Sequence, residues 1–375
     1  MIKISIILPY KENFSPTYAG AVSLHVEHIS QNSIFKKNIQ VFGNTKYKKK
    51  FKSNYTNITF NQLFLSSNQK KYIKNFIEIE KSNPSSLIEI HNRPLYLKQL
   101  TDKLNRKFVF HYHNDPLTMN GSRLPSERIF MINNCEKIIF ISEWVKKRFL
   151  KNINESYLDE DKFIIINHSI NKKKINFAKK KKIITFVGRL NSSKGYDLFG
   201  KSIIKILDKH KDWYAHVAGD EPREKLNFYH DRLIKHGFIN HDEILKLYEK
   251  SSIAVTCSRW EEPFGRTSLE ASSRGCAVIV SNRGGLNETV TNAVKLKDLN
   301  QKELYKEIDN LIIKKKIRIN FQKLSYKNFY LNHKYISNIT DNYRSSILKN
   351  FSTNKKNLKI VHLTNFNHRY DGRLF

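Results

Sequence analysis

Short apolar runs alternate with helical patterns along most of the chain, and this alternation limits the possible folds more than any other feature. Apolar runs of strand length in the first part occupy residues 2–9, 87–91, 108–113, 138–142 and 163–167. They recur in the second part at residues 183–187, 214–218, 253–257 and 277–280. Helical periodicity marks residues 21–30, 69–81, 143–150, 197–209, 302–315 and much of 320–348. This order predicts α/β units with parallel sheets and helices on both faces.

A lysine-rich segment divides the alternation into two blocks. Residues 172–182 are mostly lysine and contain few apolar side chains, which is typical of a linker. We therefore expect a first domain over residues 1–171 and a second domain over residues 172–335. Two α/β domains joined in this way enclose a cleft, and ligands tend to bind in such clefts.

The chain is strongly basic. It has 375 residues and a net charge of +33, from 67 basic and 34 acidic residues. This charge favours negatively charged partners, such as nucleic acid, an anionic membrane surface or a phosphate-bearing substrate. Abundant lysine, asparagine and isoleucine are also typical of an AT-rich genome, so the charge alone does not distinguish a partner from compositional bias.

Cysteine usage and hydropathy indicate a cytoplasmic chain. Cys135, Cys257 and Cys276 show no C-x-x-C spacing, and the last two stand in apolar stretches that suit small core residues. No disulfide framework is implied, which fits a reducing compartment. No apolar run approaches the ~18 residues of a membrane span, so we expect at most peripheral contact with the inner face of an anionic membrane.

Residues 261–288 hold the most informative group of side chains. Glu262 and Glu270 flank a short loop, and a helix is predicted from residue 266 to 274. A glycine, a buried strand and the pair Gly284-Gly285 follow. A helix start presents free backbone N–H groups that bind phosphate. Carboxylates repel a phosphate, so acidic side chains beside a phosphate site need another reason to be there. Their usual role is to accept hydrogen bonds from hydroxyl groups of the ligand. Phosphate together with several hydroxyls indicates a nucleotide sugar.

The sequence EPFG, followed by LEA, a glycine, an apolar strand and GGLNE, resembles the retaining glycosyltransferases of the bacterial group 1 family, also called family 4-like. Glu262 and Glu270 match its motif of two glutamates separated by seven residues. The resemblance implies the GT-B architecture, in which two Rossmann-like domains face each other across a cleft. It also implies that a C-terminal helix, here residues 336–350, crosses back to the first domain.

The end of the chain is a separate prediction. Leu358–Leu363 has the pattern of a strand and echoes the first strand of the chain together with its loop. We interpret residues 351–375 as a tail that either begins a further module of the same kind or belongs to a truncated gene.

The resemblance assigns donor binding mainly to the second domain. The loop GRLNSSKG after the strand at 183–187 is not a P-loop, because no G-K-[ST] follows. Arg189 and Lys194 would hold the donor diphosphate and stabilise charge on the leaving group. Glu262 would contact the hydroxyls of the transferred sugar and Glu270 those of the ribose. The predicted donor-binding set is Gly20, Gly188, Arg189, Lys194, Phe264, Gly265, Arg266, Thr267 and Glu270.

Histidines mark the ends of two predicted strands in the first domain. His111 and His113 share one face of a strand and would suit a metal, but no third ligand with clear spacing is visible. The resembled enzymes need no metal, so we expect neither a metal nor another cofactor. The resemblance places His113 near the donor sugar. His91, Asn92 and Arg93 are predicted on the acceptor side. The predicted catalytic set is Glu262, His113, Lys194 and Arg189.

Together these features predict a retaining glycosyltransferase that moves a sugar from a nucleoside diphosphate to an acceptor hydroxyl. The resemblance implies a saccharide or lipid-linked acceptor and a role in bacterial surface polysaccharide or lipopolysaccharide synthesis. One alternative is another sugar-nucleotide enzyme of this fold, a phosphorylase or a 2-epimerase. The other is a nucleic-acid binder driven by charge, but the sequence shows neither basic clusters with aromatics nor a known module. No nucleic-acid partner is therefore expected.

Overall fold

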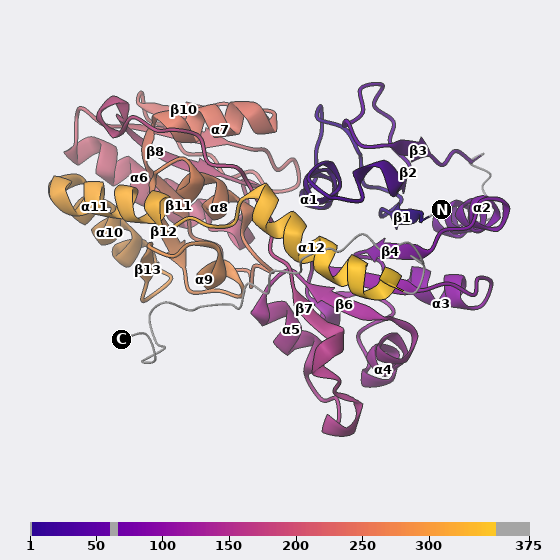
Figure 1. Cartoon of the computed structure of the whole chain (residues 1–375). Coiled ribbons are helices and arrows are strands. Elements are labelled where there is room, and N and C mark those ends of the chain that lie inside the picture. Colours follow the sequence, from indigo (N-terminus) through magenta and orange to yellow (C-terminus); the bar gives the residue numbers. More distant parts are fainter. Residues whose placement is uncertain (1, 61–66, 350–375) are drawn as a thin grey trace, which may run out of the picture.

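The computed structural model describes residues 2–60 and 67–349, which form two α/β domains lying side by side (Figure 1). The first domain is built on a parallel sheet with the strand order β3-β2-β1-β4-β5-β6-β7. Its strands are β1 (Ile4–Ile7), β2 (Ile39–Gly43), β3 (Tyr55–Asn57), β4 (Leu87–His91), β5 (Phe108–Tyr112), β6 (Lys137–Phe140) and β7 (Phe163–Ile165). Its helices are α1 (Ala21–Gln31), α2 (Asn68–Ser82), α3 (Pro94–Thr101), α4 (Pro125–Asn134) and α5 (Glu143–Leu150).

The second domain repeats this design on a sheet with the order β10-β9-β8-β11-β12-β13. Its strands are β8 (Lys181–Val187), β9 (Tyr214–Ala218), β10 (Leu233–Lys235), β11 (Ser251–Thr256), β12 (Ala277–Ser281) and β13 (Val294–Leu296). Its helices are α6 (Tyr196–Lys209), α7 (His241–Lys250), α8 (Arg266–Ser273), α9 (Leu286–Thr289), α10 (Gln301–Ile313) and α11 (Lys315–Lys327). The last described helix, α12 (His333–Leu348), follows them.

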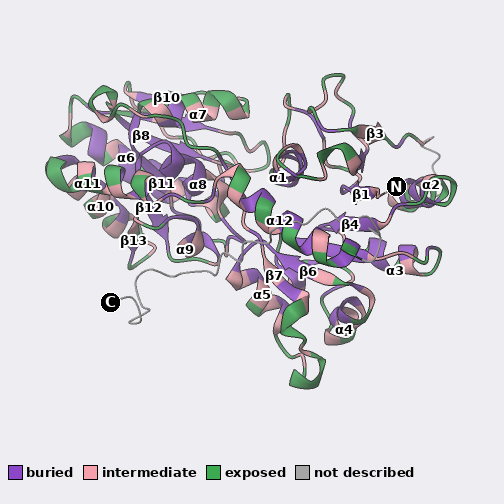
Figure 2. Ribbon diagram, viewed as in Figure 1, coloured by how far each residue is buried: buried purple, intermediate pink, exposed green. Residues whose placement is uncertain are grey.

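The central strands are buried on both faces. Every residue of β1, β4 and β5 is buried. In Figure 2 the buried strands lie between helices whose outer sides are exposed. Helices on both faces of a parallel sheet explain why these strands are nearly continuous apolar runs. The strand order reverses between β1 and β4 and again between β8 and β11. Such switch points open a crevice at the carboxyl ends of the strands.

The predicted α/β class with two parallel sheets is confirmed, since every strand pair in both sheets is parallel. The strand at residues 87–91 and the helix at residues 143–150 have the predicted bounds. Among the elements that the sequence did not predict, α7 carries a clear signal. A capping box joins Asn240 to Glu243 at its start. The predicted strand Leu358–Leu363 lies outside the described residues.

The lysine-rich segment is more ordered at its end than a linker would be. The strand β8 already begins at Lys181, so the last two predicted linker residues belong to the second sheet. The ammonium group of Lys180 donates to the carbonyl oxygens of Tyr248, Ser251 and Arg274 at 2.7–2.8 Å. Because a cation satisfies carbonyls at the end of α7, this segment is anchored to the second domain.

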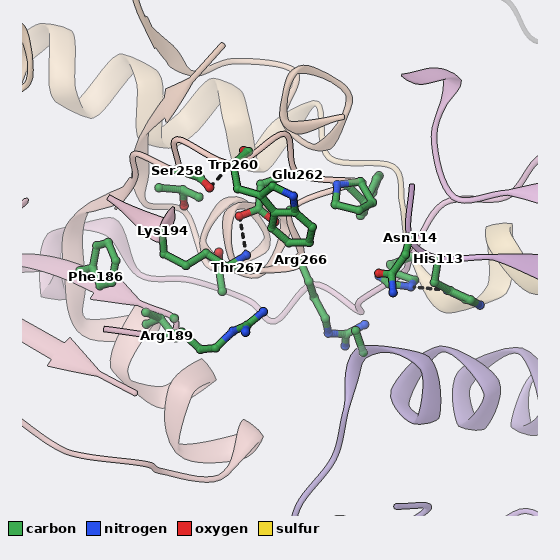
Figure 3. A pocket seen from close by; sticks show the side chains of 18 residues that line it. His113, Asn114, Phe186, Arg189, Lys194, Ser258, Trp260, Glu262, Arg266 and Thr267 are labelled. Atoms are coloured by element: carbon green, nitrogen blue, oxygen red, sulfur yellow. Dashed lines mark hydrogen bonds and ion pairs between the residues drawn. The ribbon is translucent and has the colours of Figure 1, made fainter. Parts of the chain in front are cut away.

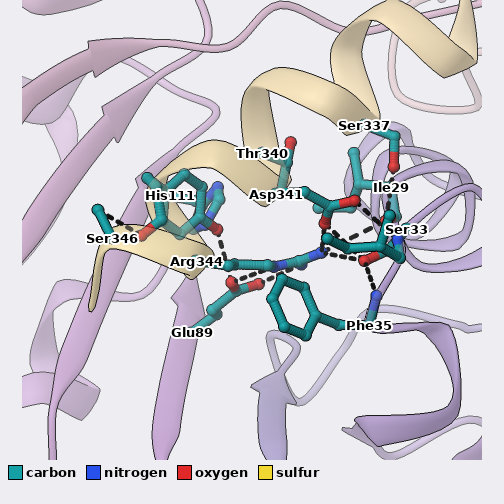
Figure 4. A network of polar contacts seen from close by, with 12 residues as sticks. Ile29, Ser33, Phe35, Glu89, His111, Ser337, Thr340, Asp341, Arg344 and Ser346 are labelled. Carbon is teal, nitrogen blue, oxygen red and sulfur yellow. Dashed lines mark hydrogen bonds and ion pairs between the residues drawn. The ribbon is translucent and has the colours of Figure 1, made fainter. Parts of the chain in front are cut away.

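The helix α12 returns the chain to the first domain, where it packs against α1 (Figure 1). Its Arg344 is fully buried and binds Glu89 of β4 with two nitrogens, at 2.7 and 2.8 Å (Figure 4). Tyr343 donates to the same carboxylate at 2.6 Å, and Asp341 accepts from Ser33 at 2.6 Å. A buried ion pair with this many hydrogen bonds fixes the position of the helix rather than adding large net stability.

We expect Arg344→Leu to lower the free energy of unfolding by about 3–5 kcal/mol, because it leaves the buried Glu89 carboxylate without its cation. Urea unfolding followed by circular dichroism measures this loss. The double variant Glu89→Leu/Arg344→Leu should lose less than the sum of the two single variants. Lys81→Ala, which removes an exposed ion pair with Glu78, should cost less than about 1 kcal/mol and serves as the control. A loss below 1 kcal/mol for Arg344→Leu would contradict the assigned role.

Candidate functional site

A cavity of about 280 Å³ opens between the domains at the carboxyl ends of β8 and β11. The second domain lines it with the ends of these strands and the loop that leads into α8 (Figure 3). The first domain contributes Ala21 of α1, His113 and Asn114 after β5, and His168 after β7. Because β8 and β11 flank the switch point of the second sheet, the cavity lies where ligands of open α/β sheets bind.

The loop after β8 places two cations at the cavity. Arg189 is exposed and lines the cavity, and Figure 3 shows it together with Lys194 on the side opposite His113. The Asn191 side chain accepts from the Lys194 N–H at 3.0 Å and so closes the turn. Gly195 has φ +77°, and a Cβ there would lie 1.9 Å from the Cys257 carbonyl oxygen. The turn is therefore packed directly on the end of β11, which fixes where the Lys194 side chain begins.

Glu262 lines the cavity beside these two cations. Its carboxylate accepts from the Lys194 ammonium at 2.6 Å, and that ammonium also lies 4.6 Å from the Trp260 ring centroid. The backbone of Glu262 is held by the Gly-Gly pair. The Gly285 N–H donates to its carbonyl at 2.6 Å, and a Cβ at Gly284 would lie 2.2 Å from the same oxygen. The glycines thus permit a backbone approach that holds the acidic side chain in the cavity.

Arg266, the first residue of α8, carries a buried positive charge without hydrogen-bond partners. All three of its guanidinium nitrogens are buried and lack such a partner, although Nε lies 2.8 Å from a Glu270 oxygen. Burial lowers the pKa of this guanidinium below its ordinary value. Arg266 lines the cavity next to Gly265 and Thr267. It stands at a helix start, where the first N–H groups have no partner within the helix. The arrangement suits an anion.

Glu270 does not line the cavity. It is buried on the second turn of α8, where its carboxylate accepts from His241 of α7 at 2.8 Å and lies beside Arg266. Burial opposes ionisation, but His241 and Arg266 together hold the pKa of this carboxyl below its ordinary value. The structure therefore places Glu270 behind Arg266, and His241 is a partner that no local sequence pattern indicates.

On the first-domain side, His113 forms the centre of a chain of imidazoles. Its Nε2 lies 3.0 Å from Nδ1 of His91, and its Nδ1 lies 3.1 Å from Nε2 of His168. Burial lowers the pKa of His113 to about 3, so the ring is neutral at physiological pH. His168, which the sequence did not single out, lines the cavity with His113 and packs edge-on against Phe264 of the second domain.

The predicted acceptor-side residues lie near the cavity without lining it. His91 and Asn92 are buried behind His113, whose N–H donates to the Asn92 side chain at 3.2 Å. Arg93 instead lines a second cavity of about 330 Å³ in the first domain, together with Arg123. Asn114 lines both cavities, so they are neighbours.

Gly20 also lies outside the lining. It is the residue before α1, and a Cβ there would lie 2.2 Å from a carboxylate oxygen of Glu12. That carboxylate accepts from the Ser23 N–H at 3.0 Å and so caps the helix. The glycine makes room for this capping carboxylate.

The predicted residues that do line the cavity form the larger group. They are Gly188, Arg189, Lys194, Glu262, Phe264, Gly265, Arg266, Thr267 and His113. Those that do not line it are Gly20, His91, Asn92, Arg93 and Glu270.

Two contacts tie the domains together beside the cavity. The Ser142 hydroxyl donates to the Pro263 carbonyl at 2.6 Å. The Glu288 carboxylate accepts from the backbone N–H groups of Glu143 and Trp144 at 2.6 and 3.0 Å. A side chain of the second domain thus caps the start of α5 in the first domain and holds the two sides in register.

A pair of histidines lies where α1 meets the start of α12. The rings of His28 and His333 lie against each other with centroids 3.7 Å apart and planes tilted by 32°. Burial lowers the pKa of His333 to about 4 and that of His28 well below its ordinary value. Both rings are therefore packed in their neutral form.

The family model described as glycosyl transferases group 1 matches residues 167–328. Among curated proteins, the putative glycosyltransferase YtcC of Bacillus subtilis is 27% identical over 244 residues, which are 57% of this chain and 60% of that protein. The lipopolysaccharide core biosynthesis mannosyltransferase LpsB of Rhizobium meliloti is 34% identical over 130 residues, which are 32% of this chain and 37% of that protein. The matched segments thus span less than two thirds of these relatives.

Solved structures match more of the chain. Sucrose-phosphate synthase from Thermosynechococcus elongatus superposes with a TM-score of 0.73 at 15% identity, covering 93% of this chain and 100% of that one. The HepE protein of Anabaena in complex with UDP-glucose gives a TM-score of 0.72 at 16% identity, covering 92% and 100%. These likenesses show that the fold is the predicted GT-B architecture.

The His28–His333 pair predicts a loss of stability in acid. Because the folded pKa of His333 lies below its unfolded value, the unfolded chain binds more protons between pH 6.5 and about 4. For each unit by which the pH falls through this range, each such residue lowers the free energy of unfolding by up to about 1.4 kcal/mol. Urea unfolding at pH 7.0 and 5.5 should therefore show a shallower pH dependence in His333→Phe than in the wild type. Lys334→Ala, at the exposed neighbouring position, should keep the wild-type dependence, and equal slopes in all three would contradict the assignment.

Proposed function

We propose that this chain, which belongs to the group 1 glycosyl transferases through residues 167–328, moves a sugar from a nucleoside diphosphate to an acceptor hydroxyl with retention of configuration. The observation that carries the proposal is the composition of the interdomain cavity. Lys194, Arg189 and Arg266 line it, the last of them at the start of α8, and the buried Glu262 carboxylate is paired with Lys194. Cations beside a carboxylate suit a ligand that has both phosphates and hydroxyls.

In this proposal the three cations act on the leaving diphosphate. Negative charge develops there as the glycosidic bond breaks, and fixed cations and helix N–H groups stabilise that charge without reorganisation. Arg266 lacks hydrogen-bond partners in the described structure, so an anion would supply the interactions that its buried guanidinium lacks. Glu262 would turn toward the hydroxyls of the transferred sugar once the diphosphate engages Lys194.

The ribose contact proposed for Glu270 requires a rearrangement. Its carboxylate is buried and paired with His241 and Arg266, so it reaches a ribose only if these pairs separate on donor binding. The acceptor proton would go to the leaving phosphate, since neutral His113 has both ring nitrogens engaged by other histidines. The transfer proposed here uses no cofactor.

The acceptor would enter from the first domain. The cavity that contains Arg93 and Arg123 adjoins the donor cavity at Asn114 and offers positive charge to a saccharide or lipid-linked acceptor. LpsB is named as a lipopolysaccharide core mannosyltransferase and HepE was solved with UDP-glucose, which supports surface-polysaccharide synthesis and makes UDP-sugars the first donors to test. No helix among residues 2–60 and 67–349 is long and apolar enough to cross a bilayer. We propose a cytoplasmic enzyme that meets the inner membrane face through its basic surface.

A phosphorylase or 2-epimerase of the same fold is the alternative, and product analysis separates them. The purified chain is first screened by thermal shift with UDP-glucose, GDP-mannose and ADP-glucose. The stabilising donor is then incubated with saccharide acceptors. Transfer releases a nucleoside diphosphate and forms a glycoside, whereas epimerisation leaves a nucleotide sugar and phosphorolysis needs inorganic phosphate. If no nucleotide sugar stabilises the chain while DNA retains it at low salt, the charge-driven nucleic-acid binder becomes the better reading.

Lys194→Met should lower kcat/KM for transfer by about 100-fold or more, because it removes one fixed cation from the leaving group while the apolar stem stays. Initial rates of nucleoside diphosphate release measure the change. Lys201→Met alters an exposed lysine on the following helix and should keep the wild-type rate. Wild-type turnover in Lys194→Met would remove the assigned role.

Arg266→Met should weaken binding of the stabilising nucleotide sugar by more than 10-fold, because it removes a buried guanidinium whose nitrogens have no hydrogen-bond partner in the free protein. It should also lower the melting temperature, because Glu270 then keeps only His241 as a partner. Calorimetric titration and a melting curve test the two parts separately. Unchanged donor affinity would show that Arg266 serves Glu270 and not the donor.

A further inference from the structure

Five buried histidines meet at the carboxyl end of the first sheet. They are His25 on α1, His91 on β4, His111 on β5, His113 after β5 and His168 after β7, and none is more than 7% exposed. The ring centroid of His25 lies 5.2 Å from that of His113, and the rings of His91 and His111 stack at 4.1 Å. Groups this polar are seldom gathered inside a protein unless they bind each other or a ligand.

The hydrogen bonds within the cluster leave several nitrogens without partners. His113 is bonded on both sides, to His91 and to His168. Within the described structure, His25 Nδ1, His91 Nε2, His111 Nδ1 and His168 Nδ1 are buried and have no hydrogen-bond partner. Since nearly all buried side-chain polar atoms in proteins are partnered, this surplus needs an explanation.

The hydrogen on His111 can be located from its neighbours. Tyr343 donates its only hydroxyl hydrogen to the Glu89 carboxylate at 2.6 Å. The Nε2 of His111, 3.1 Å from the same hydroxyl, must therefore donate to it. A neutral imidazole that donates from Nε2 has a lone pair on Nδ1, which is the unpartnered nitrogen. Histidine ligands of metals are oriented in this way by an outer partner on the other nitrogen.

We propose that His25, His111 and His113 bind one divalent transition-metal ion of the kind that prefers imidazole, such as Zn²⁺. One nitrogen from each of the three lies within 4.8 Å of those of the other two. Zn–N bonds of about 2.0–2.1 Å place tetrahedral ligands roughly 3.4 Å apart, so small ring rotations close the site. The ion takes the place of one of the two hydrogen bonds of His113.

Two neighbouring groups favour this set of ligands. The other arrangement of donor atoms, Glu89 with His91 and His111, is already occupied, because both Glu89 oxygens bind Arg344 and one also binds Tyr343. The Arg344 charge itself is balanced by Glu89 and Asp341, which reduces its repulsion of an added cation. Sequence spacing indicated only His111 and His113, since His25 comes from a distant helix.

The ion would act as a cross-link between α1 and β5. Ala21 at the start of α1 and His113 after β5 both line the interdomain cavity, so the cross-link holds the first-domain wall of that cavity in place. This role is structural and does not depend on the proposed sugar transfer.

The test uses the full chain stripped with EDTA and then titrated with Zn²⁺, with bound ion counted by elemental analysis. All proteins carry His216→Ala, because the exposed His216–His236 pair, with nitrogens 2.9 Å apart, is a second place for zinc. In this background we expect one bound ion and a rise in melting temperature of about 5 °C at saturating zinc. His25→Ala should lose both. His28→Ala, one turn further along the same helix and half-buried, should keep both.

Two results would overturn the proposal: no ion bound at 100-fold excess of zinc over protein, or an ion retained with equal affinity by His25→Ala. Where His25→Ala does not fold, X-ray absorption at the zinc edge of the unsubstituted cluster decides instead. Scattering from three imidazoles supports the site, and scattering from fewer than three excludes it.

Discussion

The buried carboxylate of Glu89 is the contact on which the return of the chain to the first domain depends. The chain leaves the second domain after α11, and α12 is held on the first domain by the pair between Glu89 and Arg344. The same carboxylate orders Tyr343, which orders His111. A hydrophobic replacement of such a pair can be as stable, but it would not fix one position of the helix. The position of α12 and the state of the histidine cluster are therefore set together.

The cavity between the domains holds more positive charge than its own carboxylates neutralise. Lys194 is paired with Glu262, whereas Arg266 has only a poorly aligned contact with Glu270 and no hydrogen bond. Because buried N–H groups without hydrogen-bond partners are costly, a phosphate that enters would gain interactions that the free protein lacks. Ser142 and Glu288 join the domains beside this point, so the ligand would bind in a site whose two sides are already in register.

The sequence predicted the features that depend on residues close together in the chain, and it did not predict those that depend on distant residues. Local pattern was enough for the strand at 87–91, for the helix start at Arg266 and for the loop that carries Lys194, since each depends on neighbours in sequence. Contacts between distant segments were not predictable in this way. The partner of Glu270 is His241, the space near Gly20 is filled by Glu12, and the third histidine of the cluster lies on α1. The capping box at Asn240 was visible in the sequence and would have located α7.

Some of the many basic side chains have a structural role, so neither a charged partner nor genome composition alone explains the excess of positive charge. Lys180 donates to the carbonyl of Tyr248 in the last turn of α7, and Arg318 donates to those of Leu311 and Ile312 in the last turn of α10. Arg232 binds the carbonyl of Leu207 in the last turn of α6. These carbonyls lie in the last turns of their helices, at the negative end of the helix dipole, where a cation is favourable. A count of basic residues therefore overstates the charge available to a membrane or a nucleic acid, and the cations of the cavity are better judged one by one, by what already binds them.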